Sequence, residues 1–235
     1  MTVNLSPLAK QAPDFRDPKL GKFRRPWGFL VHTSGGGITA AAKKKKKLPI
    51  DVALSVYKSF QNGSEGYKWG GPHYVLEHNG TLHQIAPDDV VTYHCGGDDR
   101  AKYVDGSWIK EAHPAAVAKW FAQWGPRYKA PNQLYPSKSA NTDYVGIEMI
   151  PCGDGFGIPM APGLRFSKEQ HDAIVDLGRD LAARHEWPAG WHRTTRLCGH
   201  EDVQLLNRMD RGGGWDPGFL REKPYFDFDY VRAHV

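Results

Sequence analysis

The hydrophobic pattern of the chain predicts short buried strands that are separated by helices and long loops. Three apolar runs bounded by turn residues are typical of buried strands, and they cover residues 27–33, 144–150 and 195–199. The dipeptide Asn79-Gly80 lies between two further runs and is a strong signal for a two-residue turn. Residues 73–77 and 81–85 are therefore expected to form a β-hairpin.

Helical periodicity appears in three other segments. Each begins at a recognised start signal, and these signals are Pro49, Pro114 and the capping box Ser167–Gln170. The segment from Pro114 carries apolar residues at i, i+3, i+4 and i+7, namely Val117, Trp120, Phe121 and Trp124. Strands and helices alternate without a glycine-rich nucleotide loop, which predicts an α/β fold with a mixed central β-sheet flanked by helices.

The domain organisation follows from a change in composition near residue 25. Residues 1–25 are polar and contain prolines, so they are expected to form an N-terminal arm over the surface. Residues 26–235 are long enough to bury a core and are expected to form a single domain with inserted loops.

The net charge of the chain indicates which class of partner to expect. The formal net charge of +5 favours a polyanionic surface. No helix-turn-helix, zinc-finger or RNA-recognition signature is present, so we expect no nucleic-acid ligand. No apolar run approaches the ~18 residues of a membrane span, and the first residues lack the pattern of a signal peptide. We therefore expect neither a membrane span nor export by the general route.

The cysteines and most of the histidines predict no site by themselves. Cys95, Cys152 and Cys198 have no C-x-x-C spacing, so a disulfide framework is not expected. Cys95 and Cys198 adjoin candidate site residues, and we expect them to be buried as small apolar side chains. Five histidines at polar or loop positions are expected to be exposed: His78, His83, His171, His185 and His234.

Four other residues together predict a metal enzyme. His32 ends the first strand, His200 follows the last strand, and Asp216 precedes Pro217-Gly218. Two imidazoles and one carboxylate are a typical catalytic zinc set, because three protein ligands leave a fourth position for water. Glu148 lies in an otherwise apolar strand, where it can take a proton from that water and return it to a leaving amine.

These segments, in this order, resemble the type-2 zinc-dependent N-acetylmuramoyl-L-alanine amidases, whose fold is shared with phage lysozyme-amidases and peptidoglycan recognition proteins. The resemblance covers roughly residues 27–220. It implies that Zn²⁺ is held by His32, His200 and Asp216, and that Glu148 is the catalytic acid–base.

The resemblance also implies a substrate-binding side of the site. His94, in the turn Tyr93-His94-Cys95-Gly96, corresponds to a substrate-side wall in relatives, and Asn141 stands ahead of Glu148 as an asparagine often does there. His73, on the strand of the predicted hairpin, either lines the cleft or is a packed, hydrogen-bonded histidine.

Three departures from the family pattern affect the assignment of roles in the site. The spacing from His200 to Asp216 is longer than is usual in relatives, because of the turn-prone insert 208–214, and Asp210 is a rival third ligand. Gly214 stands where relatives often have a Lys or Thr for the oxyanion, which leaves Arg208, Arg211 or the metal for that role. Pro72 replaces a tyrosine that some relatives use, so the acid–base role rests on Glu148 alone.

The function implied by this resemblance is hydrolysis of the amide between the lactyl group of N-acetylmuramic acid and L-alanine in peptidoglycan. The basic balance and the run Lys43–Lys47 favour a phage lysin that stays in the host cytoplasm until it is released to the cell wall, or that is carried in a phage particle. A recycling amidase, a non-catalytic peptidoglycan-binding protein and a structural phage-particle protein are the alternatives.

The run Lys43–Lys47 yields a prediction about attachment. It carries no aromatic or glycine-loop partners, so we expect it to contact anionic wall or outer-membrane material without affecting the chemistry. Replacing the five lysines with Ser should weaken wall binding mainly at low salt, since the Debye length is ~8 Å at physiological ionic strength. Binding to purified walls and hydrolysis of a soluble muropeptide are measured in parallel. Equal loss of both would show that the run helps to build the active site.

Overall fold

A computed structural model of the chain describes residues 4–12, 24–33, 70–95, 114–137, 139–151, 165–205, 216–221 and 224–235. Within these ranges the chain forms one six-stranded mixed β-sheet with the strand order β1-β4-β3-β5-β2-β6. The strands are β1 (Lys10–Gln11), β2 (Gly28–Thr33), β3 (Tyr74–Leu76), β4 (Leu82–Gln84), β5 (Tyr144–Met149) and β6 (Leu197–Gly199). Strand β2 is parallel to both β5 and β6, β5 is parallel to β3, and β3 is antiparallel to β4.

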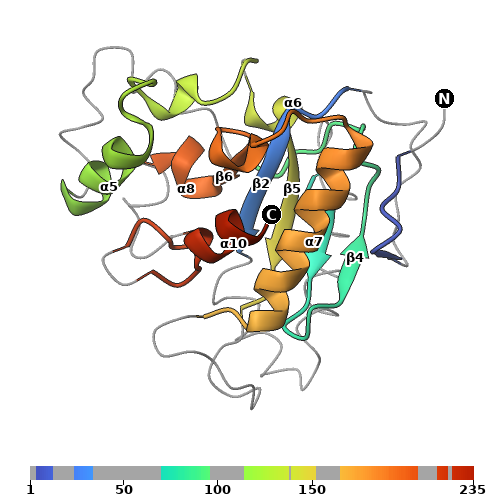
Figure 1. Cartoon of the computed structure of the whole chain (residues 1–235). Helices are drawn as coiled ribbons and strands as arrows, with labels where there is room; N and C mark the ends of the chain where they lie inside the picture. The colour runs from blue at the N-terminus through green and yellow to red at the C-terminus, as the bar shows by residue number, and fades with distance from the viewer. Residues whose placement is uncertain are drawn as a thin grey trace.

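Helices flank this sheet, as the sequence predicts (Figure 1). Among the described residues the α-helices are α5 (Pro114–Trp124), α6 (Ala140–Asp143), α7 (Lys168–Arg184), α8 (His200–Val203) and α10 (Phe228–His234). The 3₁₀ turn η2 (Pro131–Gln133) lies between α5 and α6, and η3 (Trp191–Arg193) lies between α7 and β6. Helix α7 runs across one face of the sheet with α10 beside it (Figure 1). None of the helices within the described ranges is long and apolar enough to span a membrane.

The predicted start signals act as expected, and the predicted hairpin forms, although its turn spans the three residues 78–80 rather than two. The Ser167 hydroxyl accepts a hydrogen bond from the Gln170 N–H, and the Gln170 side chain accepts one from the Ser167 N–H, so the capping box before α7 is complete. Gly80 has φ +83°, a left-handed conformation that glycine adopts without strain, and it closes the hairpin between β3 and β4. The hairpin and the helices that begin at Pro114 and Lys168 are therefore confirmed.

Each end of the chain adds an element to the fold that the hydrophobic pattern did not predict. Lys10 and Gln11, in the expected N-terminal arm, form the edge strand β1 beside β4. Helix α10 packs on α7 near the C-terminus. The boundary of the domain near residue 25 stays a prediction, and the helix expected after Pro49, the run Lys43–Lys47 and Cys152 lie outside the described residues.

Two histidines that were expected in solvent are buried, so that prediction was wrong. His171 stacks on Phe226 and accepts a hydrogen bond from the Asp227 N–H at 3.1 Å, because the segment before α10 covers this part of α7. His185, at the end of α7, lies against Trp187. Cys95 and Cys198 are buried, as expected.

A buried carboxylate joins α7 to the hairpin. Asp88 is fully buried and accepts hydrogen bonds from the Tyr74 hydroxyl at 2.5 Å and the Gln84 amide at 3.2 Å. Arg184 of α7 pairs with the other oxygen of Asp88. Because these donors are far apart in the sequence, this single side chain connects β3, β4 and α7.

We expect Asp88→Ala to lower the free energy of unfolding by about 3 kcal/mol, because Arg184 and the Tyr74 hydroxyl lose their common buried acceptor. Urea denaturation measures the change. Asp176→Ala is the matched control, since Asp176 lies on α7 with a side chain that is 63% exposed and pairs with Arg179 at 3.5 Å. It should shift stability by no more than about 0.5 kcal/mol. Equal effects would contradict the structural role of Asp88.

Candidate metal centre

Three buried side chains converge where strands β2 and β6 end. The Nδ1 atom of His32 lies 2.8 Å from Nδ1 of His200. A carboxylate oxygen of Asp216, Oδ2, lies 2.8 Å from Nδ1 of His200 and 3.6 Å from Nδ1 of His32. The exposed fractions of the three residues are only 1–5%. Three atoms that can each donate a lone pair therefore face one another among buried side chains.

Hydrogen bonds on the far sides of the two rings determine which nitrogens carry protons. His200 Nε2 lies 2.6 Å from the Gln204 side-chain oxygen, to which it can only donate. His94 Nε2 donates to the Tyr144 carbonyl at 3.1 Å, so His94 Nδ1 is an acceptor. That acceptor lies 2.9 Å from His32 Nε2, which must donate to it. Both Nδ1 atoms at the centre are thus left with a free lone pair.

This arrangement fits a metal ion. Two lone pairs and a carboxylate oxygen repel one another unless a cation lies between them; a shared proton satisfies one of these contacts, whereas a divalent cation satisfies all three. A tetrahedral zinc site places its ligand atoms about 3.3 Å apart, close to the separations in this cluster. Burial acts to raise the pKa of Asp216, but positive charge at His200 and His32 lowers that pKa well below its usual value. A cation between the three ligand atoms would supply the same positive charge without protonating either ring.

The backbone on both sides of the cluster holds Asp216 in place. The Thr33 N–H donates to the second oxygen of Asp216, Oδ1, at 2.5 Å, which leaves Oδ2 directed at the histidines. The Glu201 N–H donates to the Asp216 carbonyl at 2.9 Å, and the Asp216–Pro217 peptide bond is cis. Strand β2, which carries His32, and helix α8, which begins at His200, thus position Asp216.

Glu201 is a residue of the site that the sequence analysis missed. Its Oε1 atom accepts hydrogen bonds from three consecutive N–H groups, of Gly218, Phe219 and Leu220, at 2.5–3.1 Å. Burial raises the pKa of Glu201 to about 8, although these donors oppose the shift. Glu201 follows His200 directly, so one glutamate ties the loop after Asp216 to the start of α8. In the sequence, only the position directly after His200 could have indicated that Glu201 belongs to the site.

Glu148 lies on β5 in register with His32 on β2, so the two side chains point to the same face of the sheet. The Tyr74 hydroxyl approaches Arg184 of α7, and Tyr74 is in register with Ile147; Tyr74 and Ile147 therefore face α7, and Glu148 faces the opposite side. Glu148 is half-buried, unlike its fully buried neighbours in β5. The structure thus brings the predicted acid beside His32, on the face of the sheet that carries the candidate metal ligands.

The predicted substrate-side residues His94 and Asn141 are both engaged within the protein. The Asn141 carboxamide oxygen accepts the N–H groups of His94 and Cys95 at 2.8 and 2.7 Å, and its amide donates to the Cys95 carbonyl at 3.2 Å. The His94 ring lies against Gly146, where a Cβ atom would be 2.6 Å from the ring. Burial, and then the nearby His32, hold the pKa of His94 well below its usual value, which keeps the ring neutral. A direct contact of either residue with substrate stays a prediction.

His73 is fully buried behind this turn. Its Nδ1 atom accepts a hydrogen bond from the Gly146 N–H at 3.0 Å, and its Nε2 atom donates to the Val90 carbonyl at 2.8 Å. Of the two interpretations of His73, these contacts are those of a packed, hydrogen-bonded histidine. Arg208 and Arg211, which were considered for the oxyanion, lie outside the described residues, as do Gly214 and the rival ligand Asp210.

Comparisons with known proteins gave one family match and two similar solved structures. The sequence model of a family described as N-acetylmuramoyl-L-alanine amidase matches residues 23–219. A search of curated proteins gave no match. Two solved structures from Clostridium intestinale URNW are similar: the endolysin N-acetylmuramoyl-L-alanine amidase LysCS, with 15% identity, and the N-acetylmuramoyl-L-alanine amidase LysC, with 14% identity. They align over 89% of this chain and over 82% and 84% of their own, with TM-scores of 0.41 and 0.40, values at which the likeness carries no argument.

We expect Asp216→Ala to abolish metal retention, because it removes both a ligand and the negative charge that compensates the cation. Asp210→Ala should keep the metal and most activity. The metal-to-protein ratio of the purified variants, measured by atomic emission, decides between the two aspartates. A metal-free Asp210→Ala protein beside a metal-loaded Asp216→Ala protein would reverse the assignment.

Proposed function

The chain belongs to the N-acetylmuramoyl-L-alanine amidase family, and we propose that it hydrolyses the amide bond between the lactyl group of N-acetylmuramic acid and L-alanine in peptidoglycan. The observation that carries this proposal is the convergence of His32 Nδ1, His200 Nδ1 and Asp216 Oδ2 beside Glu148. Hydrolysis of an unactivated amide needs a polarised carbonyl, an activated water and a proton for the leaving nitrogen, and this set of residues can supply all three.

In this proposal the two Nδ1 atoms and Asp216 Oδ2 hold Zn²⁺, which is the ion that two imidazoles and one carboxylate typically bind in hydrolytic sites. When bound, zinc polarises the amide carbonyl and lowers the pKa of water. The protein contributes the orientation of the ligands: Gln204 and His94 fix the two imidazole rings from behind, and the Thr33 N–H fixes the carboxylate.

Glu148 carries the proton. It lies on the strand next to His32 and on the same face of the sheet, so its carboxylate would face a water molecule held at the cluster. The carboxylate takes a proton from water as the oxygen attacks the lactyl carbonyl carbon. When the C–N bond breaks, the same carboxyl group delivers that proton to the nitrogen of L-alanine. The products are a lactyl carboxylate on the sugar and a free amino group on the peptide.

We further propose that the protein acts as a phage lysin, present in the host cytoplasm until it is released to the cell wall or carried in a phage particle. The formal net charge of +5 supports attraction to an anionic wall. The rival interpretation, a non-catalytic peptidoglycan-binding protein, is disfavoured because the chain keeps two histidines, an aspartate and a glutamate in one place.

The decisive experiment is digestion of purified peptidoglycan, followed by mass spectrometry of the new ends. An amidase releases stem peptides that begin with a free L-alanine amino group and leaves the glycan chains intact. New reducing sugar ends, or cleavage within the stem peptide, would reject the proposed bond. Walls that are bound but not cleaved by metal-loaded protein would favour the binding function.

Glu148→Gln should bind zinc as the parent protein does and lose at least ~100-fold in amidase turnover, because the amide side chain cannot carry the proton. Hydrolysis of a soluble muropeptide is measured together with the zinc content. Glu77→Gln is a matched control, since Glu77 is a similarly half-buried glutamate that pairs with His83 at 2.5 Å. It should retain near-parental turnover. A metal-loaded Glu148→Gln enzyme with parental activity would remove Glu148 from the mechanism.

A further inference from the structure

We propose that the chain has a second metal site, formed by His32 Nε2, His94 Nδ1 and Cys95 Sγ, which takes a thiophilic divalent cation and shares His32 with the first site. The two sites use opposite nitrogens of the same imidazole ring. The first site faces His200 and Asp216, and the second faces the turn 93–95.

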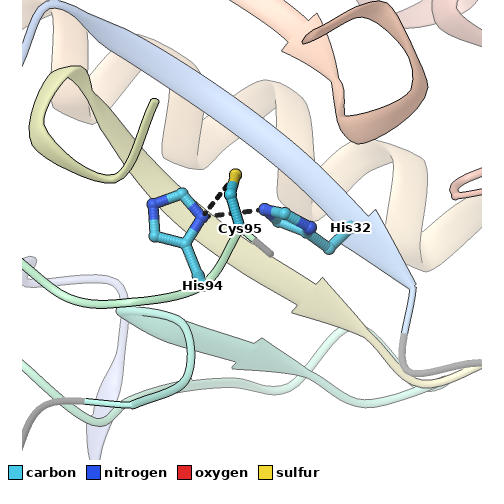
Figure 2. Close-up of side chains that lie close together, drawn as sticks. All are labelled: His32, His94 and Cys95. Atoms are coloured by element: carbon cyan, nitrogen blue, oxygen red, sulfur yellow. Dashed lines mark hydrogen bonds between the residues drawn. The ribbon is translucent and has the colours of Figure 1, made fainter. Parts of the chain in front are cut away.

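The geometry of the three donors supports this site. His94 Nδ1 lies 2.9 Å from His32 Nε2 and 3.6 Å from Cys95 Sγ, and all three ligand atoms lie within 4.8 Å of one another. Figure 2 shows the side chains pointing toward one another, His32 from β2 and the other two from the turn. Cys95 and His32 are buried and His94 is half-buried, so the donors are largely shielded from water.

The turn is fixed in a way that suits a metal site. Asn141 holds the backbone of both His94 and Cys95 through three hydrogen bonds, and the Tyr144 carbonyl accepts from the far nitrogen of His94. An anchored second ring nitrogen is the usual support of a metal-binding histidine. The ligand atoms are therefore oriented before any ion arrives, which lowers the cost of ordering them.

The two described cysteines differ in the atoms that surround their thiols. The Cys198 thiol donates to the Thr195 carbonyl at 3.3 Å and contacts the Tyr144 hydroxyl, so it is surrounded by backbone and phenol oxygens. The Cys95 thiol instead faces an imidazole nitrogen, beside which a second imidazole lies. Burial alone accounts for Cys198, whereas the surroundings of Cys95 are those of a ligand.

The chemistry of binding is balanced by proton release. A cation at this site displaces the proton of the Cys95 thiol and the proton that His32 Nε2 donates to His94, and both protons pass to solvent. His32 then bridges two ions as an imidazolate. A thiolate with two imidazole nitrogens favours Zn²⁺, Co²⁺ or Cd²⁺ over Mg²⁺ or Ca²⁺.

We expect the second ion to inhibit the enzyme. It replaces the hydrogen bond by which His94 orients His32, and it draws electron density from a ligand of the first site. Loss of such outer support typically costs 10–100-fold in metal affinity or activity, so excess metal should lower turnover by at least about tenfold. This effect on turnover rests on the proposed function, whereas the binding of a second ion does not.

The test is a titration of the metal-free, full-length protein with Co²⁺, followed by absorption spectroscopy and by the bound metal-to-protein ratio. The parent protein should bind two equivalents and show the near-ultraviolet charge-transfer band of a cobalt–thiolate bond. Cys95→Ser should bind one equivalent without that band. Cys198→Ala and Cys152→Ser are the matched controls and should each behave as the parent does.

A single equivalent bound by the parent, or a thiolate band that persists in Cys95→Ser, would overturn the proposal. If Cys95→Ser does not fold, Cys95→Ala replaces it, and the stoichiometry of the parent protein decides without any variant. Turnover at one equivalent and at excess Zn²⁺ is compared within each protein, and inhibition should disappear in Cys95→Ser. Absence of all amidase activity beside a normal cobalt result would reject the proposed function and leave the second site standing.

Discussion

Strand β2 lies between β5 and β6, and its parallel pairing with both strands determines which side chains meet at the metal centre. The register places His32 opposite Glu148 and Val31 opposite Gly199, so His200 follows at the end of the neighbouring strand. Because side chains alternate between the faces of a sheet, a shift of one residue would turn His32 toward the face that α7 covers. The candidate ligands His32 and His200 and the proposed proton carrier Glu148 depend on this one alignment.

The parts of this structure that sequence reasoning could predict are those encoded by neighbouring residues. The capping box before α7, the turn at Asn79-Gly80 and the apolar run of β5 each act within a few positions. The order of the two histidines, the aspartate and Glu148 along the chain indicated one site, and the structure brings these side chains together. Which nitrogen of each ring faces the centre depends on Gln204 and His94, and it could not be read from order alone.

The features that escaped prediction come from contacts between distant segments. Strand β1 is too short to show alternation, and it exists only because β4 offers an unpaired edge. In the sequence Glu201 is an ordinary acid near the start of a helix. In the structure it accepts hydrogen bonds from three backbone N–H groups that begin seventeen residues further along the chain. His171 follows a polar pattern along α7, and only the segment before α10 makes its position an interior one.

The site depends on the absence of a Cβ atom at Gly146. The His94 ring occupies the place where any side chain at position 146 would begin, since a Cβ there would lie 2.6 Å from the ring. An alanine would displace the imidazole and with it the hydrogen bond that orients His32, without altering a single polar residue. Inventories of active sites that record only groups with reactive atoms would overlook this position. Whether a distant homologue is still an active enzyme therefore depends on a glycine at this position as well as on the ligands.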